Sequence, residues 1–234
     1  MNAIVGCFAV FLCAGMLWAE KPADRKTYLA GLSQEMQVKW PRNRVINIVC
    51  HGHSVPAGYF KTPVVDSFNA YPHLLHKELK SRAPFAVMNV IVTAIGGESS
   101  DRGAERFERD VLSLNPEVVT IDYGLNDRRI GLKKARESWV KMIEAAKANG
   151  VKVLLLTPTG DLRATMNDLN DPLNQHAQQI RELAKEHEVG LVDSMKYFAS
   201  YEGEMNDLMS QINHPNRKGH DLVVRELMKW FLVK

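Results

Sequence analysis

Residues 45–54 read VINIVCHGHS, and this stretch decides the fold. Its first six residues, Val45 to Cys50, are nearly all apolar and show little of the alternation that marks a half-exposed strand. A short apolar run of this kind predicts a parallel strand buried on both faces. A glycine-containing turn with two histidines follows directly and ends in the hydroxyl of Ser54. The stretch therefore predicts a buried strand with polar side chains at its carboxyl end.

The rest of the chain repeats this pattern, with helix-length segments between the apolar runs. Further apolar runs occupy residues 86–93, 118–123, 151–157 and 190–193. Segments expected to be helical occupy residues 24–40, 71–82, 100–114, 132–149, 170–188 and 216–233. The alternation predicts the α/β fold class, as a doubly wound, three-layer α/β/α sheet of about five parallel strands. No repeat or linker interrupts the pattern, so residues 20–234 are expected to form one domain.

Composition and charge exclude one class of partner. The 234 residues are 45% hydrophobic and 24% charged, with a formal net charge of +3. These values fit a single globular domain with a sizeable core. The basic residues are interleaved with acidic ones, as between Arg102 and Asp110, and form no stripe that could follow a nucleic-acid backbone. We therefore expect no nucleic-acid partner.

The N-terminus differs from the rest of the chain. Residues 1–19 carry no charged side chain, and Ile4 to Trp18 are almost all apolar. This length is short for a membrane span and typical of a signal peptide, and Ala19 is a small residue suited to cleavage. We expect a signal peptide at residues 1–19, a secreted or periplasmic location and no stable membrane span after cleavage; a retained anchor is the alternative. Cleavage would leave Cys50 as the single cysteine, which excludes a disulfide framework.

Polar residues follow the predicted strands at the positions where open parallel sheets bind ligands. Ser54 follows the first strand, Gly96 the second and Asn126 the third, and His214 comes just before the last helix. A serine hydroxyl, a histidine base and N–H donors from a glycine loop and an amide are the components of an acyl-transfer site. The order of these residues therefore predicts nucleophilic catalysis by Ser54.

The four segments together resemble the SGNH/GDSL hydrolase family, which carries a serine, a glycine, an asparagine and a histidine in this order. The resemblance spans essentially the whole chain after residue 19 and implies the flavodoxin-like SGNH fold. It implies Ser54 as nucleophile and His214 as base, with the Ser54 and Gly96 N–H groups and the Asn126 amide as the oxyanion hole. It further implies a serine esterase acting on short-chain esters, acetyl esters of carbohydrate among them, on a small molecule or a polysaccharide. We expect no cofactor and no metal.

Two departures from the family pattern bear on the chemistry. His53 stands before the nucleophile where the family has an acid, and Gln211 stands three residues before His214 where the family places an aspartate. A glutamine carbonyl could fix the tautomer of the histidine, but it has no charge to stabilise the imidazolium. We therefore expect a Ser54–His214 dyad whose ring is oriented by Gln211 or by a backbone carbonyl. His53 is expected to be a pocket wall or a group that modulates the serine.

Several alternatives stay open. Glu98, Glu204 and Asp207 are carboxylates that could replace the missing acid. Without an acid, the chain could instead be a catalytically silent glycan-binding protein on the same fold. Taken alone, Ser54 could be a helix N-cap and Asn126 an ordinary turn residue.

The remaining histidines offer a third class of function. His51 with His53, and His73 with His76, have spacings that could hold a metal ion and would then indicate a metal-dependent hydrolase. No His-Glu-x-x-His motif accompanies them, so the sequence favours the serine esterase over the metal-dependent hydrolase. His176 is expected at the surface of a charged helix.

Aromatic residues cluster near the first loop. Tyr59, Phe60 and Tyr71 could form a wall that stacks on sugar, or they could belong to the core.

Overall fold

The structure is a computed structural model that describes residues 21–231. The expected signal peptide at residues 1–19, together with its cleavage point after Ala19, lies outside the described residues. Within the described part of the chain, no helix is long and apolar enough to cross a membrane. Cys50 is free and buried.

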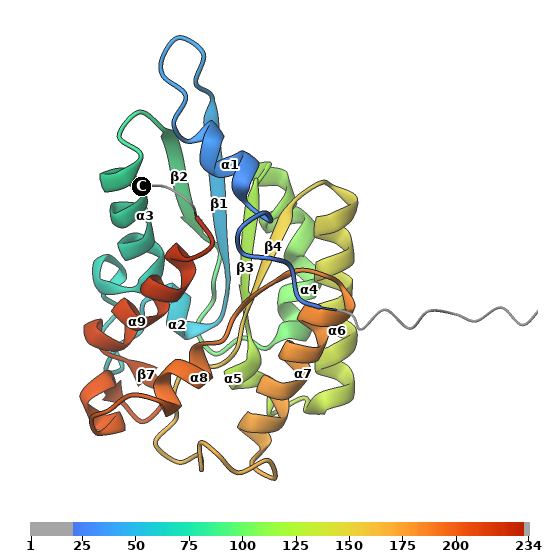
Figure 1. Cartoon of the computed structure of the whole chain (residues 1–234). Helices are drawn as coiled ribbons and strands as arrows, with labels where there is room; N and C mark the ends of the chain where they lie inside the picture. Colours follow the sequence, from blue (N-terminus) through green and yellow to red (C-terminus); the bar gives the residue numbers. More distant parts are fainter. Residues whose placement is uncertain (1–20, 232–234) are drawn as a thin grey trace, which may run out of the picture.

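Five parallel strands form the central sheet in the order β2-β1-β3-β4-β5 (Figure 1). Each strand lies on one of the predicted apolar runs, and all five residues of β3 are buried, as expected for a strand covered on both faces. The strand order confirms the predicted fold class, a three-layer, flavodoxin-like α/β sheet. The strands are β1 (Val45–Gly52), β2 (Val87–Val92), β3 (Val118–Asp122), β4 (Lys152–Leu156) and β5 (Gly190–Val192).

Helices cover both faces of the sheet (Figure 1). Alternate residues of β1 divide between two cores: Ile48 and Cys50 pack with α1, α3, α8 and α9, whereas Val49 packs with α4 and α6. The longer helices are α3 (Tyr71–Arg82), α4 (Ser100–Asp110), α6 (Gly131–Ala148), α7 (Pro172–Glu186) and α9 (Arg217–Met228). The shorter ones are α1 (Ala30–Glu35), α2 (Ser54–Ala57), α5 (Gly124–Asp127), α8 (Ser194–Ala199), and the 3-10 turns η1 (Ser67–Asn69), η2 (Leu112–Leu114) and η3 (Met205–Leu208).

The carboxyl ends of β1 and β3 meet where the strand order reverses, the usual ligand position in such sheets. Gly52 at the end of β1 is in register with Asp122 at the end of β3. A Cβ on Gly52 would lie 2.4 Å from the Asp122 carbonyl oxygen, so this approach requires glycine. The N–H of His53 then donates to the same carbonyl at 3.1 Å, which holds the turn before Ser54 beside β3.

A two-stranded antiparallel hairpin carries His214. It consists of β6 (Met209–Gln211) and β7 (His214–Pro215), and β7 contacts α2. Asn216 caps the following helix α9, since its Oδ1 accepts the N–H groups of Lys218 and Gly219 at 2.9 and 3.2 Å. The cap and the hairpin fix the backbone on either side of His214.

Two local predictions are wrong. The N-terminal helix α1 covers Ala30–Glu35 rather than residues 24–40, and turns precede it. There Tyr28 reaches the sheet and its hydroxyl accepts the N–H of Val153 at 3.1 Å, a tertiary contact that overrides the helical spacing. His176 is 3% exposed rather than at the surface, because α7 packs against α5. Burial, followed by the nearby Arg128, lowers the pKa of His176 to about 4.

Candidate active site

Ser54 is the first residue of α2, the short helix that follows β1. The residue that caps this helix is His53, whose Nδ1 accepts the Val55 N–H at 3.2 Å. The Ser54 hydroxyl is therefore not the cap, which removes the simplest structural explanation for a serine at this position. Ser54 is 6% exposed, so its hydroxyl is largely shielded from water.

His214 lies directly against Ser54, although 160 residues separate them in the sequence. His214 Nε2 is 2.9 Å from Ser54 Oγ, a hydrogen-bond distance suited to transfer of the hydroxyl proton. Burial lowers the pKa of His214 below its ordinary value of 6.5; a hydrogen bond to the Phe60 carbonyl opposes this effect, and His53 adds to it. The ring is therefore neutral at neutral pH and can accept a proton.

Two groups meet the other ring nitrogen of His214. Nδ1 is 2.8 Å from the Phe60 carbonyl oxygen and 2.7 Å from Gln211 Nε2. The Thr62 N–H donates to Gln211 Oε1 at 3.0 Å, and this bond orients the amide with its N–H groups toward the ring. Gln211 thus favours the tautomer with an unprotonated Nδ1, whereas the Phe60 carbonyl favours Nδ1–H. Only the second tautomer leaves Nε2 free to accept from Ser54.

The carboxylates considered as replacements for the missing acid are directed elsewhere. Glu98 accepts from Arg106 Nε at 2.9 and 3.1 Å and from the Tyr123 hydroxyl at 2.8 Å. Glu204 is the N-cap residue of η3 and Asp207 lies within it, and both are exposed. Across residues 21–231, the side chains that hydrogen-bond the His214 ring are those of Ser54 and Gln211, and neither is an acid.

Asn126 and Gly96 lie on neighbouring loops that are tied together. Asn126 Nδ2 donates to the Glu98 carbonyl at 2.9 Å, which uses one of the two amide N–H bonds and leaves the other. Gly96 packs against Tyr59, and a Cβ at this position would lie 2.7 Å from the Tyr59 ring. An ion pair between Glu98 and the buried Arg106 ties the loop that carries Gly96 to α4. The loop that carries Gly96 and the helix that carries Asn126 are thus joined through Glu98.

The residue after Asn126 fixes the short helix α5. The buried Asp127 carboxylate accepts the Ser100 N–H at 2.8 Å and the Trp139 Nε1–H at 2.7 Å. Burial raises the pKa of Asp127 to about 6 despite these two bonds. Asp127 therefore ties the short helix that carries Asn126 to α4 and α6.

The two histidines of the first loop face different partners. His51 is fully buried, with Nδ1 2.8 Å from Thr93 Oγ1 and Nε2 3.1 Å from the Tyr123 hydroxyl. Burial lowers the pKa of His51 to about 3, so the ring stays neutral. His53 instead points toward β3, where its Nε2 lies 3.3 Å from Asp122 Oδ1. Among residues 21–231, no three histidine, cysteine or acidic side chains are grouped in a way that could hold a metal ion.

Two groups of this site were not among the residues expected from the sequence. The Phe60 carbonyl is a backbone group and carries no signal in residue types. Asp122 could have been found from the sequence. An acid at the carboxyl end of an otherwise apolar strand predicts a buried charge, which is rare, at the edge of the sheet where ligands bind.

The aromatic residues of the first loop divide between site and core. Tyr59 is half-buried, and its ring centroid lies 6.0 Å from that of His214. Phe60 is also half-buried and contacts His220, with 5.2 Å between ring centroids. Tyr71 is fully buried and belongs to the core, the second of the two alternatives.

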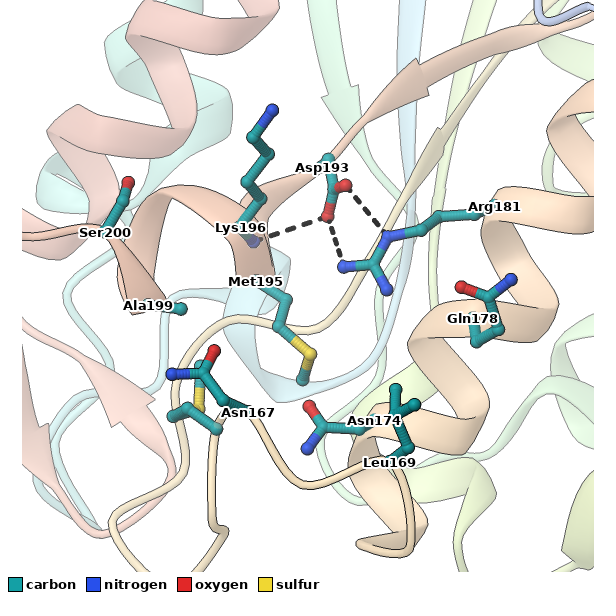
Figure 2. A pocket seen from close by; sticks show the side chains of 11 residues that line it. Asn167, Leu169, Asn174, Gln178, Arg181, Asp193, Met195, Lys196, Ala199 and Ser200 are labelled. Carbon is teal, nitrogen blue, oxygen red and sulfur yellow. Dashed lines mark hydrogen bonds and ion pairs between the residues drawn. The ribbon is translucent and has the colours of Figure 1, made fainter.

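A separate pocket of about 520 Å³ opens beyond the carboxyl end of β5, between α7 and α8 (Figure 2). On its wall, Arg181 donates to both carboxylate oxygens of Asp193 at 2.9 Å. Although burial opposes its ionisation, Arg181 lowers the pKa of Asp193. Asp193 occupies a strand-end position, but its charge is neutralised within this pocket and does not serve His214.

Residues 50–222 match the model of the GDSL-like Lipase/Acylhydrolase family. This range contains Ser54, Gly96, Asn126 and His214. A curated relative is an uncharacterized lipoprotein, YqeF, of Bacillus subtilis (strain 168), which is 26% identical over 149 residues covering 50% of this chain and 58% of the relative. The chain therefore spans little more than half the length of this relative.

Solved structures share the fold at low sequence identity. A two-domain esterase (CEX) active on acetylated mannans, co-crystallized with mannopentaose, has a TM-score of 0.72 and 19% identity, covering 91% of this chain and 54% of that chain. A catalytic mutant of Axe2, an acetylxylan esterase from Geobacillus stearothermophilus, has a TM-score of 0.68 and 17% identity, covering 85% of this chain and 97% of that chain. At these identities the likeness shows a common fold.

Proposed function

This chain belongs to the GDSL-like lipase/acylhydrolase family, a family of carboxylic ester hydrolases, and on that basis we propose its reaction. It is a serine esterase that removes short acyl groups, acetyl above all, from carbohydrate. The observation that supports this most directly is the 2.9 Å contact between Ser54 Oγ and His214 Nε2 at the point where the strand order reverses.

The reaction follows from the positions of the site residues. Ser54 Oγ attacks the acyl carbonyl carbon and passes its proton to His214 Nε2. The oxyanion accepts the N–H groups of Ser54 and Gly96 and the second N–H of the Asn126 amide. The departing alcohol takes the proton from His214, and water then hydrolyses the acyl-enzyme. The Phe60 carbonyl accepts Nδ1–H throughout, which keeps Nε2 basic.

Two observations support an acylated carbohydrate as substrate. CEX acts on acetylated mannans and Axe2 is an acetylxylan esterase, and both share this fold. The half-buried ring of Tyr59 lies beside His214 and offers an apolar surface on which a sugar can pack.

The proposed place of action is outside the cytoplasm. It rests on the apolar residues 1–19, taken as a signal peptide ahead of a hydrolase domain from residue 20. A relative that carries the name lipoprotein is consistent with an extracellular or periplasmic location.

One labelling experiment separates the esterase from the silent glycan-binding alternative. The protein is treated with a fluorophosphonate probe, the adduct is located by peptide mass spectrometry, and acetate release from acetylated mannan and xylan is measured in parallel. We expect an adduct on Ser54 together with acetate release, because a base-activated serine attacks both. A folded protein that binds the polysaccharide, resists the probe and releases no acetate would contradict the esterase.

Gln211→Glu is expected to move the acid limb of the pH profile upward. Glutamate has the length of glutamine and places a carboxylate oxygen where Nε2 now lies, 2.7 Å from His214 Nδ1. The negative charge stabilises the imidazolium and raises the pKa of His214, which burial holds below 6.5 in the wild type. Because His214 must be neutral to accept the Ser54 proton, kcat/KM is lost as the pH falls through this pKa.

The measurement is kcat/KM for p-nitrophenyl acetate across the acidic and neutral range. We expect the midpoint of the acid limb to rise by about one pH unit in the variant. Gln178→Glu is the matched control, since Gln178 is exposed on α7 and the same charge there leaves the midpoint in place. An unmoved midpoint in Gln211→Glu would contradict His214 as the base.

A further inference from the structure

Ser54 Oγ faces two imidazoles rather than one. His214 Nε2 lies 2.9 Å from this oxygen, and His53 Nδ1 lies 3.4 Å from it. The second distance is long for a hydrogen bond, but contacts between catalytic groups are often long until substrate is bound. His53 is therefore near enough to the nucleophile to take part in the transfer of its proton.

The far side of His53 meets a buried carboxylate. His53 Nε2 is 3.3 Å from Asp122 Oδ1, and the two side chains are 1% and 3% exposed. Burying a carboxylate without a counter-charge is costly, and the contact between Asp122 and His53 becomes an ion pair only when His53 is protonated. Asp122 can thus stabilise a positive charge on His53, which is the contribution that Gln211 cannot make to His214.

The surroundings determine which nitrogen of His53 carries the proton. The Val55 N–H donates to Nδ1 at 3.2 Å, so Nδ1 presents its lone pair and the neutral ring carries its proton on Nε2. Nε2 lies 3.3 Å from Asp122 Oδ1, close enough for electrostatic attraction but outside hydrogen-bond geometry. Burial and, to a lesser extent, the Asp122 charge raise the pKa of Cys50 to about 12 and raise that of Tyr71 as well. Both groups are neutral, so neither balances the carboxylate in place of His53.

We propose that the His53–Asp122 pair is a second proton acceptor for Ser54 and supplies the carboxylate that position 211 lacks. The inference rests on the esterase reaction proposed above. The pair occupies the reversal point of the sheet, because His53 follows β1 and Asp122 ends β3. Neither residue is a recognisable part of a serine–histidine–acid triad in the sequence, and only the pairing of β1 with β3 brings them together.

The step is a proton transfer coupled to acyl transfer. As the Oγ–C bond forms, the carbonyl π electrons move onto oxygen and the Ser54 proton passes to His53 Nδ1, while Nε2 keeps its proton 3.3 Å from Asp122 Oδ1. Once protonated, Nδ1 can no longer accept the Val55 N–H. The attraction between the imidazolium and the Asp122 carboxylate offsets the lost hydrogen bond. When the C–O bond to the alcohol breaks, the leaving oxygen takes the proton. In deacylation the attacking water gives its proton to the same nitrogen, which returns it to Ser54 Oγ.

A simpler role for His53 is to cap α2, and substitutions separate the two roles. His53→Asn keeps a cap, because its Oδ1 can accept the Val55 N–H, but has no imidazole. His53→Ala removes both the cap and the imidazole. Asp122→Asn keeps the shape of the carboxylate and removes its charge.

Each variant is assayed for kcat and KM with p-nitrophenyl acetate, and its thermal unfolding midpoint is measured. We expect His53→Asn and Asp122→Asn each to lower kcat about tenfold with KM within about twofold. The double variant should lose no more than either single one, because Asp122 acts through His53. In a His214→Ala background, fluorophosphonate labelling of Ser54 should persist at a reduced rate, and His53→Asn should slow it at least about tenfold further.

Three results would overturn the proposal. The first is wild-type kcat in His53→Asn with a loss in His53→Ala, which would leave only the cap. The second is a double variant whose loss of kcat is the product of the two single losses. The third is a rate of Ser54 labelling in the His214→Ala background that His53→Asn does not change. If Asp122→Asn fails to fold, the effect of His53→Asn in the wild-type and His214→Ala backgrounds decides whether His53 accepts the Ser54 proton. An inert, unlabelled wild type would instead mean that the proposed esterase function has failed.

Discussion

Ser54→Ala is expected to lower kcat by a factor on the order of 10⁵ with little change in KM. The substitution removes a single oxygen, whose partners are His214 Nε2 and His53 Nδ1. Without it no acyl-enzyme can form, and the oxyanion donors can only assist direct attack by water, which is a slow reaction. The substitution leaves the proposed sugar-packing surface of Tyr59 untouched, so binding should persist.

The measurement is acetate release from the best polysaccharide together with the dissociation constant for that polysaccharide. Ser81→Ala is the matched control, because Ser81 lies in the last turn of α3 and its Oγ donates to the Glu78 carbonyl at 2.7 Å. We expect wild-type kcat in that control and similar unfolding midpoints in both variants. If Ser54→Ala kept more than about one per cent of kcat, the nucleophile would have to be another group.

The sheet could be predicted from the sequence because each of its strands is a short apolar run; β3 is buried along its whole length, whereas the edge strand β2 is partly exposed. The same patterns predicted α3 over Tyr71–Arg82 and placed Ser54 and Asn126 at strand ends. Parallel strands bring their carboxyl ends to one edge, so the placement of these two residues at the same edge of the sheet followed from their order in the chain. His214 lies on the antiparallel hairpin β6–β7 instead, so its contact with Ser54 could be expected only from the resemblance to the family.

The parts that could not be predicted depend on single tertiary contacts. Whether Gln211 or a backbone carbonyl orients His214 depends on the Thr62 N–H, which fixes the amide, and on the path of the loop that carries Phe60. The Asp122–His53 approach needs the close register of β1 and β3 at Gly52. Such contacts leave no periodicity in the sequence, since each involves one residue pair and often a backbone atom.

Asn126→Ala is expected to lower kcat by roughly 10² to 10³, which corresponds to about 3 kcal/mol of lost transition-state stabilisation. One amide N–H of Asn126 already donates to the Glu98 carbonyl at 2.9 Å, and that bond aims the side chain. The second N–H is left for the oxyanion. Because the substrate carbonyl carries its full negative charge only in the tetrahedral intermediate and the transition states around it, the loss should fall on kcat rather than KM.

The controls must separate this contact from an ordinary loss of a hydrogen bond. Asn149→Ala removes the same kind of bond, since Asn149 Nδ2 donates to the Ala145 carbonyl at 2.9 Å at the C-terminus of α6, and it should retain wild-type kcat. Asn126→Asp keeps the size of the side chain but sets a negative charge beside the oxyanion, so it should be at least as slow as Asn126→Ala. Should Asn126→Ala keep kcat within about threefold of the wild type while its unfolding midpoint is unchanged, the backbone N–H groups of Ser54 and Gly96 must hold the oxyanion alone.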